Sequence, residues 1–105
     1  MSLEWSPRAE HDLLALKSYI AEDSPLYARQ FAERLIHTVE TLPLFPRKGR
    51  TVPEMGFRDD IREVLFQGYR IIYRLPTEDR IEIITVVHGA RDLRKQDVIT
   101  SDQDS

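Results

Sequence analysis

The C-terminal half of the chain shows hydrophobic positions with a period of two. Three runs at 61–66, 69–75 and 80–88 are rich in β-branched and aromatic residues and are separated by short turns. In the run at 69–75, every second residue is a large apolar or aromatic side chain, and two of the three residues between them are arginines. This alternation is typical of β-strands, and Gln67-Gly68 suits a two-residue hairpin turn. The pattern therefore predicts three antiparallel strands.

In the N-terminal half, apolar residues recur every three or four positions instead. The two stripes are Ala9, Leu13, Leu16 and Ile20, and then Ala28, Phe31, Leu35, Val39 and Leu42. Each stripe follows a Ser-Pro pair, Ser6-Pro7 or Ser24-Pro25, in which serine suits an N-cap and proline the first helical position. The spacing predicts two amphipathic helices, and the short connection between them predicts an antiparallel hairpin.

The remaining segments complete a predicted fold. Residues 3–5 alternate apolar and polar side chains, which predicts a short first strand. Segment 43–56 contains several prolines and glycines and is predicted to be a loop. The element order is therefore β-α-α-β-β-β. We expect an α+β fold in which the helical hairpin packs on one face of a small antiparallel sheet.

Strand alternation places Arg70 and Arg74 on the sheet face opposite the predicted helices. No predicted element covers that face, so Ile72, Ile84 and Val86 are expected to be exposed on it. Two interpretations stand at this point. The arginines form solvated ion pairs with nearby carboxylates, or they belong to a surface that contacts a partner.

Composition limits the class of protein. The 105 residues are 41% hydrophobic and 31% charged, which is typical of a globular domain. We assign the domain to 1–98 and expect the acidic tail at 99–105 to be disordered. The formal net charge of -3 does not indicate nucleic-acid binding, and the absence of cysteine excludes disulfides. No apolar run has the length of a membrane span and no secretory signal is present, so we expect a cytoplasmic protein without a membrane partner.

Few residues are candidates for chemistry. His11, His37 and His88 have no metal-ligand spacing, and the glycines do not cluster into a phosphate-binding loop. We therefore predict neither a metal nor a cofactor. Metal-free RNA cleavage would need a base, a cation and an acid, and Arg62, Arg74 and His88 are groups of the right kind. The signal is weak because the chain contains few lysines.

The order of several short motifs resembles the RelE/ParE toxin superfamily, and in particular its ParE branch. The motifs run from residue 5 to residue 92. They are Trp5-Ser-Pro-x-Ala9-x-x-Asp12-Leu, Tyr19-Ile-Ala-x-Asp-Ser-Pro25, Ala28-x-x-Phe31-x-x-x-Leu35, Leu42-x-x-x-Pro46-x-x-Gly49-Arg50-x-Val-Pro-Glu54, Arg62-Glu63, Tyr69-Arg-Ile-Ile-Tyr-Arg74 and Val87-His-Gly-Ala-Arg-Asp92. The resemblance implies the same β-α-α-β-β-β fold that the periodicity predicts.

The resemblance also implies a function. A ParE-like toxin of a type II toxin–antitoxin module would inhibit DNA gyrase, form a hetero-oligomer with its cognate antitoxin and be neutralised by it. A RelE-like alternative would cleave mRNA on the ribosome, with Arg62, Arg74 and His88 as the catalytic groups. The chain lacks the C-terminal tyrosine and the lysine cluster of such nucleases. A third alternative is an inactive member that only binds an antitoxin.

Two sets of contact residues follow from this resemblance as expectations. The target would be bound by Arg70, Arg74, His88, Arg91 and Arg94. The antitoxin would be bound by Leu14, Tyr19, Tyr27, Ile72, Ile84 and Val86.

Overall fold

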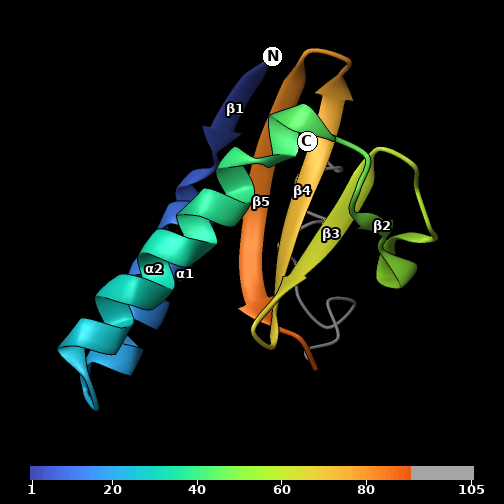
Figure 1. Ribbon diagram of the computed structural model, residues 1–105. Coiled ribbons are helices and arrows are strands. Elements are labelled where there is room, and N and C mark those ends of the chain that lie inside the picture. Colours follow the sequence, from blue (N-terminus) through green and yellow to red (C-terminus); the bar gives the residue numbers. More distant parts are fainter. Residues whose placement is uncertain (91–105) are drawn as a thin grey trace.

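A computed structural model describes residues 1–90 and shows two helices packed on a five-stranded sheet within that range (Figure 1). The elements are β1 (Ser2–Trp5), α1 (Pro7–Ala21), α2 (Pro25–Glu40), the 3₁₀ helix η1 (Leu42–Leu44), β2 (Arg50–Thr51), the 3₁₀ helix η2 (Pro53–Met55), β3 (Ile61–Phe66), β4 (Tyr69–Thr77) and β5 (Arg80–His88). The predicted α+β class is confirmed. The predicted domain end at 98 and the tail at 99–105 lie outside the described residues.

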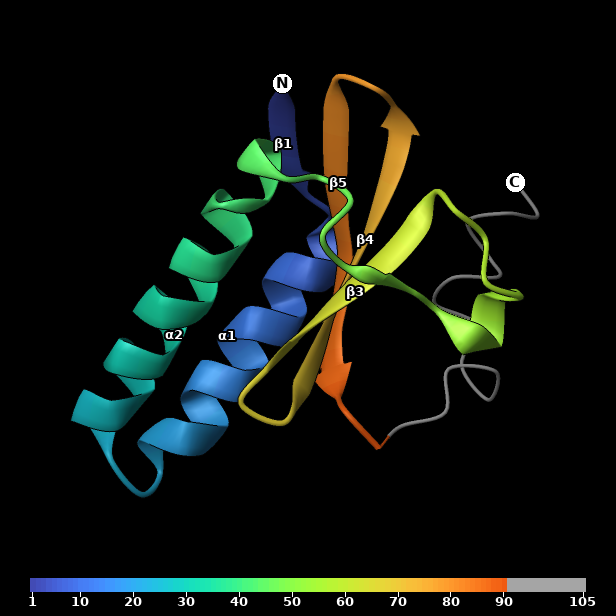
Figure 2. The ribbon, with the colours of Figure 1, turned by 45° about the vertical axis from the view of Figure 1, so that its right-hand side comes forward.

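Both helices begin where the Ser-Pro pairs predicted. The Ser6 hydroxyl accepts a hydrogen bond from the Ala9 amide, and the Ser24 hydroxyl accepts one from the Tyr27 amide. These bonds satisfy backbone donors that a helix start would otherwise leave unpaired. Both helices cover the same face of the sheet, as Figure 2 shows. The helix-side core consists of Ala9, Phe31, Leu35, Val39, Leu42, Val64, Ile71, Tyr73, Ile81, Ile83 and Val86.

The strand order is β1-β5-β4-β3-β2, and the three long strands form the predicted antiparallel meander. The turn at Gln67 and Gly68 has positive φ angles of 47° and 86°, as a tight two-residue hairpin requires. The first strand differs from the prediction, because β1 pairs with β5 in parallel. It therefore joins the sheet at the strand farthest from it in sequence.

The second face of the sheet is covered, and this corrects the sequence analysis. The segment predicted to be only a loop contains β2 and η2, and its Val52 and Met55 side chains pack against Ile61, Ile72, Ile84 and Val87. The expectation that Ile72 and Ile84 are exposed is therefore wrong. Sequence alternation failed to predict this because the cover comes from a proline-containing segment without strand periodicity.

Val86 is also buried, but on the other face. The pairing between β4 and β5 passes from Ile72 with Thr85 to Tyr73 with Ile83, so β5 has one extra residue there. Such a bulge interrupts the alternation of side chains along a strand. As a result Val86 belongs to the helix-side core, and the prediction that it is exposed is wrong.

The start of α1 is joined to β5 by polar contacts. The Ser6 hydroxyl donates a hydrogen bond of 2.8 Å to the Ile84 carbonyl. The Asp12 carboxylate accepts one from the Val86 amide at 3.0 Å and one from the Thr85 hydroxyl. These contacts satisfy backbone groups of β5 beyond the point where β1 ends. Among residues 1–90, no helix is long and apolar enough to cross a membrane.

Candidate functional site

The three candidate ribonuclease residues are not brought together. Arg74 lies opposite Glu82 and His88 lies opposite Tyr69, so the two are near opposite ends of the β4–β5 hairpin. Five residues of extended strand from Tyr69 to Arg74 correspond to about 17 Å. Since a base and an acid must both lie within hydrogen-bond reach of the reacting atoms, Arg74 and His88 do not form one catalytic site.

Arg62 is separated from Arg74 and His88, because its guanidinium binds backbone carbonyls of a loop. Its guanidinium donates to the carbonyls of Gly49 at 2.8 Å, Asp59 at 3.0 Å and Arg47 at 3.2 Å. Only 13% of its side chain is exposed. In the strand register Arg62 lies opposite Tyr73, on the other side of the pleat from Arg74. Arg62 therefore holds segment 47–59 against β3.

Arg70 is buried in an ionic cluster, which corrects its predicted role. Its guanidinium forms hydrogen bonds to both carboxylate oxygens of Glu54, at 2.6 and 2.9 Å, and to Glu63 at 2.6 Å. The second Glu63 oxygen accepts from Arg50 at 2.6 Å. The bond to Glu54 is the main cause that raises the pKa of Arg70. Arg70 is only 4% exposed, so the expectation that it lies on an open face is wrong, and this burial argues against its predicted contact with a target.

Arg74 and His88 keep some access to solvent. Arg74 forms an ion pair of 3.0 Å with Glu82, and both side chains are partly exposed. His88 is exposed, its Nδ1 accepts from the Ala90 amide at 3.2 Å, and its ring meets Tyr69 edge-on at 5.8 Å between centroids. Their predicted role at a target is untested. Arg91 and Arg94 lie outside the described residues.

The helical hairpin carries exposed apolar side chains at the positions predicted to bind an antitoxin. Leu14 and Tyr19 on α1 are 63% and 68% exposed, and Tyr27 on α2 is 46% exposed. The neighbouring Leu26 is also exposed. These four residues are distributed over both helices of the hairpin, and large exposed apolar groups are typical of protein-binding surfaces. The prediction for these three residues therefore stays open, in contrast to the buried Ile72, Ile84 and Val86.

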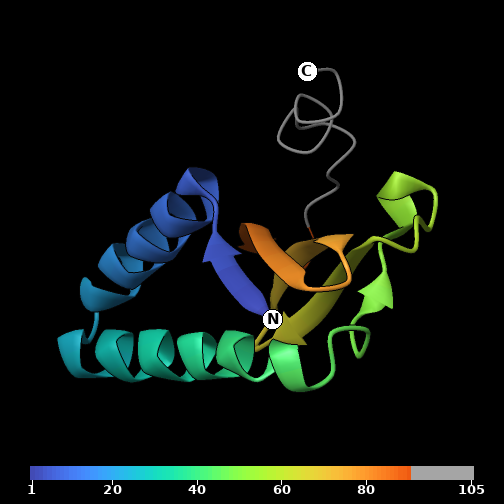
Figure 3. The same ribbon diagram turned by 90° about the horizontal axis from the view of Figure 1, so that it is seen from above.

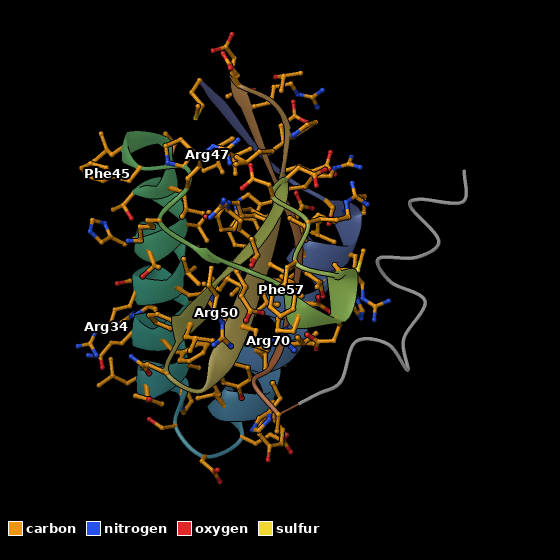
Figure 4. All side chains as sticks on the ribbon, turned by 90° about the vertical axis from the view of Figure 1, so that its right-hand side faces the viewer. Arg34, Phe45, Arg47, Arg50, Phe57 and Arg70 are labelled. Carbon is orange, nitrogen blue, oxygen red and sulfur yellow. The ribbon has the colours of Figure 1, made fainter. Side chains whose placement is uncertain are left out.

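A groove of about 740 Å³ opens where α2 ends. It is lined by Leu44, Phe45, Pro46, Arg47, Lys48, Leu75, Thr77 and Glu78. Leu44 and Phe45 are strongly exposed, and Figure 4 places Phe45 beside the end of α2. The Tyr73 hydroxyl fixes the loop below them, because it donates to the Pro46 carbonyl at 2.7 Å and accepts from the Gly49 amide at 3.0 Å. The groove therefore has a rigid, mainly apolar wall.

The η2 turn, which we define as residues 53–58, contains a feature that the sequence analysis missed. Phe57 has a φ angle of 58° and its side chain is 64% exposed. For an L-residue this left-handed conformation costs roughly 1–2 kcal/mol. Glycine tolerates it, as the preceding Gly56 does with a φ of 65°, but a bulky aromatic residue rarely adopts it. The only sequence signal was an apolar residue next to a turn glycine.

Among residues 1–90, no three His, Cys, Asp or Glu side chains gather into a group that could hold a metal ion.

Comparison with known proteins identifies the family. The model of the family described as "ParE toxin of type II toxin-antitoxin system, parDE" matches residues 3–93. The chain belongs to the ParE toxin family. It is therefore a toxin of a type II toxin–antitoxin system, as the motifs predicted.

Two individual proteins resemble this ParE family member. It is 30% identical over 87 residues to the protein named Toxin RelE2 from Caulobacter vibrioides, which covers 83% of this chain and 93% of that protein. A solved structure titled "Chromosomal ParDE TA system from P. aeruginosa" superposes with a TM-score of 0.69 at 21% identity, and covers 84% of this chain and 95% of the other. The structural match supports the fold of the ParE family member described above.

Proposed function

We propose that this toxin acts by binding and not by catalysis, that it inhibits DNA gyrase, and that a cognate antitoxin neutralises it in a toxin–antitoxin complex. The observation that carries the binding mode is the separation of Arg62, Arg74 and His88 over two faces and two ends of the sheet. The choice of gyrase as target follows from membership of the ParE family. Fold and family alone do not determine a target, so the proposal needs a direct assay.

The helical hairpin supports the antitoxin part of the proposal. Leu14, Tyr19 and Tyr27 present apolar surface to solvent, and the groove at the end of α2 adds Leu44 and Phe45. A partner segment that binds in extended or helical form needs such a row of apolar pockets and side chains. The cations Arg47 and Lys48 on the wall of the groove would suit acidic residues of the antitoxin.

The target is tested by measuring supercoiling and mRNA cleavage in parallel. Purified toxin is added to gyrase with relaxed plasmid and ATP, and separately to a translating ribosome system with a defined mRNA. We expect supercoiling to be inhibited while the mRNA stays intact. Cleavage of the mRNA that His88→Ala abolishes would instead support the alternative, a RelE-like ribonuclease. No effect in either assay or on growth would indicate an inactive family member.

The antitoxin surface is tested with two matched leucines. Leu14 on α1 and Leu65 on β3 are 63% and 61% exposed, so each can be changed to serine at a similar cost to folding. We expect Leu14→Ser to weaken binding to the antitoxin encoded beside the toxin gene, measured by calorimetry, while Leu65→Ser leaves it unchanged. Weaker binding by Leu65→Ser alone would place the antitoxin on the sheet and contradict the proposal.

A further inference from the structure

The exposed Phe57 side chain has a conformational cost that packing within the described residues does not explain. A Cβ atom in the left-handed region approaches the neighbouring carbonyl oxygen, and glycine would avoid this strain. The ring nevertheless remains mostly accessible to solvent. Backbone strain that a fold maintains at an exposed position is found mainly at functional sites. Phe57 therefore calls for an explanation outside the stability of the fold.

Hydrogen bonds within the η2 turn fix the backbone at Phe57. The Phe57 and Met55 amides both donate to the Val52 carbonyl, at 3.2 and 3.0 Å, and Val52 is fully buried. Within the same turn, both carboxylate oxygens of Glu54 accept hydrogen bonds from the buried guanidinium of Arg70. A contact residue that is already ordered loses little conformational entropy on binding. The turn thus presents this aromatic residue on a preorganised backbone.

A cluster of buried ion pairs is a costly way to stabilise a fold, because desolvation of the charges offsets their attraction. The cluster of Arg50, Glu54, Glu63 and Arg70 does, however, fix the turn relative to β3 and β4 through several directional bonds. Its arrangement is suited to positioning the turn. This supports a role for η2 in recognition.

The η2 turn lies away from the surfaces assigned to the antitoxin. Figure 3 shows η2 and the helical hairpin on opposite sides of the sheet. Figure 4 looks onto the side of η2, where Phe57 appears with Arg50 and Arg70, while Arg34 lies on α2 and Phe45 beyond its end. The toxin therefore has two separate apolar contact areas, and the second one can engage another partner.

The charges around Phe57 fit a protein better than a nucleic acid. Arg58 is held by Asp60 through two hydrogen bonds of 3.0 and 2.7 Å, and Arg50 is paired with Glu63. A surface that binds phosphates would carry an excess of cations. An apolar anchor surrounded by charges of both signs is typical of the centre and rim of a protein interface.

We propose that the η2 turn is the surface with which this toxin contacts its protein target, and that Phe57 inserts into an apolar pocket of that protein. The inference rests on the proposed function and adds the contact site. The antitoxin, in contrast, binds the helical hairpin.

The test uses two substitutions that tolerate a left-handed backbone, Phe57→Gly and Phe57→Asn. Glycine relieves the strain and asparagine adopts this conformation more readily than other residues. We expect both variants to melt at or above the temperature of the wild type and to bind the antitoxin with unchanged affinity. Inhibition of gyrase supercoiling should become weaker by about tenfold or more, as for loss of an aromatic anchor.

The matched control is Leu65→Ala. Leu65 on β3 is 61% exposed, similar to the 64% of Phe57, and is assigned no contact with the antitoxin or the target. We expect this variant to inhibit supercoiling as the wild type does. If the Phe57 variants inhibit fully, or if Leu65→Ala loses inhibition while they do not, the η2 proposal is overturned and gyrase inhibition stands.

Growth arrest separates failure of the contact site from failure of the target. A wild-type toxin that arrests growth without inhibiting gyrase would overturn the choice of gyrase, and the Phe57 variants would then be scored by arrest. If the Phe57 variants still arrest growth, the proposed contact surface at η2 is overturned. If they no longer arrest growth, it is supported. Absence of arrest and of gyrase inhibition by the wild type would overturn both proposals. Binding of purified toxin to plasmid DNA or RNA alone that Phe57→Gly abolishes would show a nucleic-acid surface and overturn the protein contact.

Discussion

The two faces of the sheet are covered by different means. On the helix side, α2 places Phe31, Leu35 and Val39 into one continuous apolar core. On the other side, segment 50–58 adds Val52 and Met55 to a smaller apolar cluster and is held by the ion pairs of Arg70. Apolar burial is strong but non-directional, whereas hydrogen-bonded ion pairs fix an orientation. The helix side therefore provides stability, and the other side provides an exact position for η2.

The largest expected loss of stability comes from removing the Arg70 ion pairs on the η2 side of the sheet. Arg70→Leu removes the buried cation that bridges Glu54 and Glu63 and leaves Glu63 with only the largely exposed Arg50. Loss of one partner from a buried pair costs about 3–5 kcal/mol. Urea unfolding measures the free energy. The double variant Arg70→Leu/Glu63→Leu should lose less, because the fully buried Glu63 carboxylate is removed together with its cation. If the single and double variants lost the same free energy of unfolding, the ion pairs would not be what stabilises segment 50–58 on this face.

On the helix side, Leu35→Ala should lower the free energy of unfolding by about 2–5 kcal/mol, the usual range for a buried leucine. Leu35 is fully buried, and the substitution leaves a cavity between α2 and the sheet. Leu14→Ala is the control, since a change at that exposed position should stay within about 0.5 kcal/mol. A loss at Leu35 as small as that at Leu14 would mean that this core contributes little.

A smaller loss of stability is expected in the loop that connects η1, on the helix side, to β2. A Cβ atom on Gly49 would lie 2.5 Å from the Tyr73 hydroxyl and 2.7 Å from the Glu63 carbonyl oxygen. Gly49→Ala should therefore destabilise by about 1–3 kcal/mol, as overpacked sites do. Gly56→Ala, where the added atom has open space, tests backbone strain alone. Thermal denaturation compares the two variants. If Gly49→Ala lost less stability than Gly56→Ala, this would argue against the close packing of the loop.

The smallest effect is the pH dependence of the ion pair between Arg58 and Asp60. The hydrogen bond from Arg58 lowers the pKa of the Asp60 carboxyl from its usual 3.8. A carboxyl with a lowered folded-state pKa adds stability above the unfolded value, and this stability is lost as pH falls through the folded value. The melting temperature of Asp60→Asn should thus lie slightly below that of the wild type at pH 7. The difference in melting temperature should begin to shrink as pH falls below the unfolded value of 3.8 and vanish only below the lower folded-state value. A difference that stays constant over this range would contradict the assignment.

Local patterns predicted the helices and the three long strands because caps, turns and periodicity are written in neighbouring residues. Ser6 and Ser24 marked both helix starts, and Gly68 marked the first hairpin. The cover of the second face depends on Val52 and Met55 meeting residues of three distant strands. Such contacts leave no local signal, so the burial of Ile72 was missed.

The candidate site was less predictable for the same reason. Arg70 and Arg74 have equivalent places in the alternation, yet Glu54 buries one while Glu82 leaves the other partly open. The bulge at Ile84 moved Val86 to the helix side without a glycine or proline to mark it. The exposed residues on the helical hairpin were easier to predict, because Leu14 and Tyr19 lie off the apolar stripe that faces the core.

The parallel pairing of β1 with β5 also affects how the toxin is made. Ser2 lies beside Arg80, and the Ser6 hydroxyl reaches the Ile84 carbonyl across 78 residues of chain. Closing so long a loop is slow relative to forming local hairpins. During synthesis, the first strand and the start of α1 have no partner until the last strand has been translated. The five-stranded sheet is therefore complete only after β5 has been synthesised, and until then the nascent chain lacks its finished sheet.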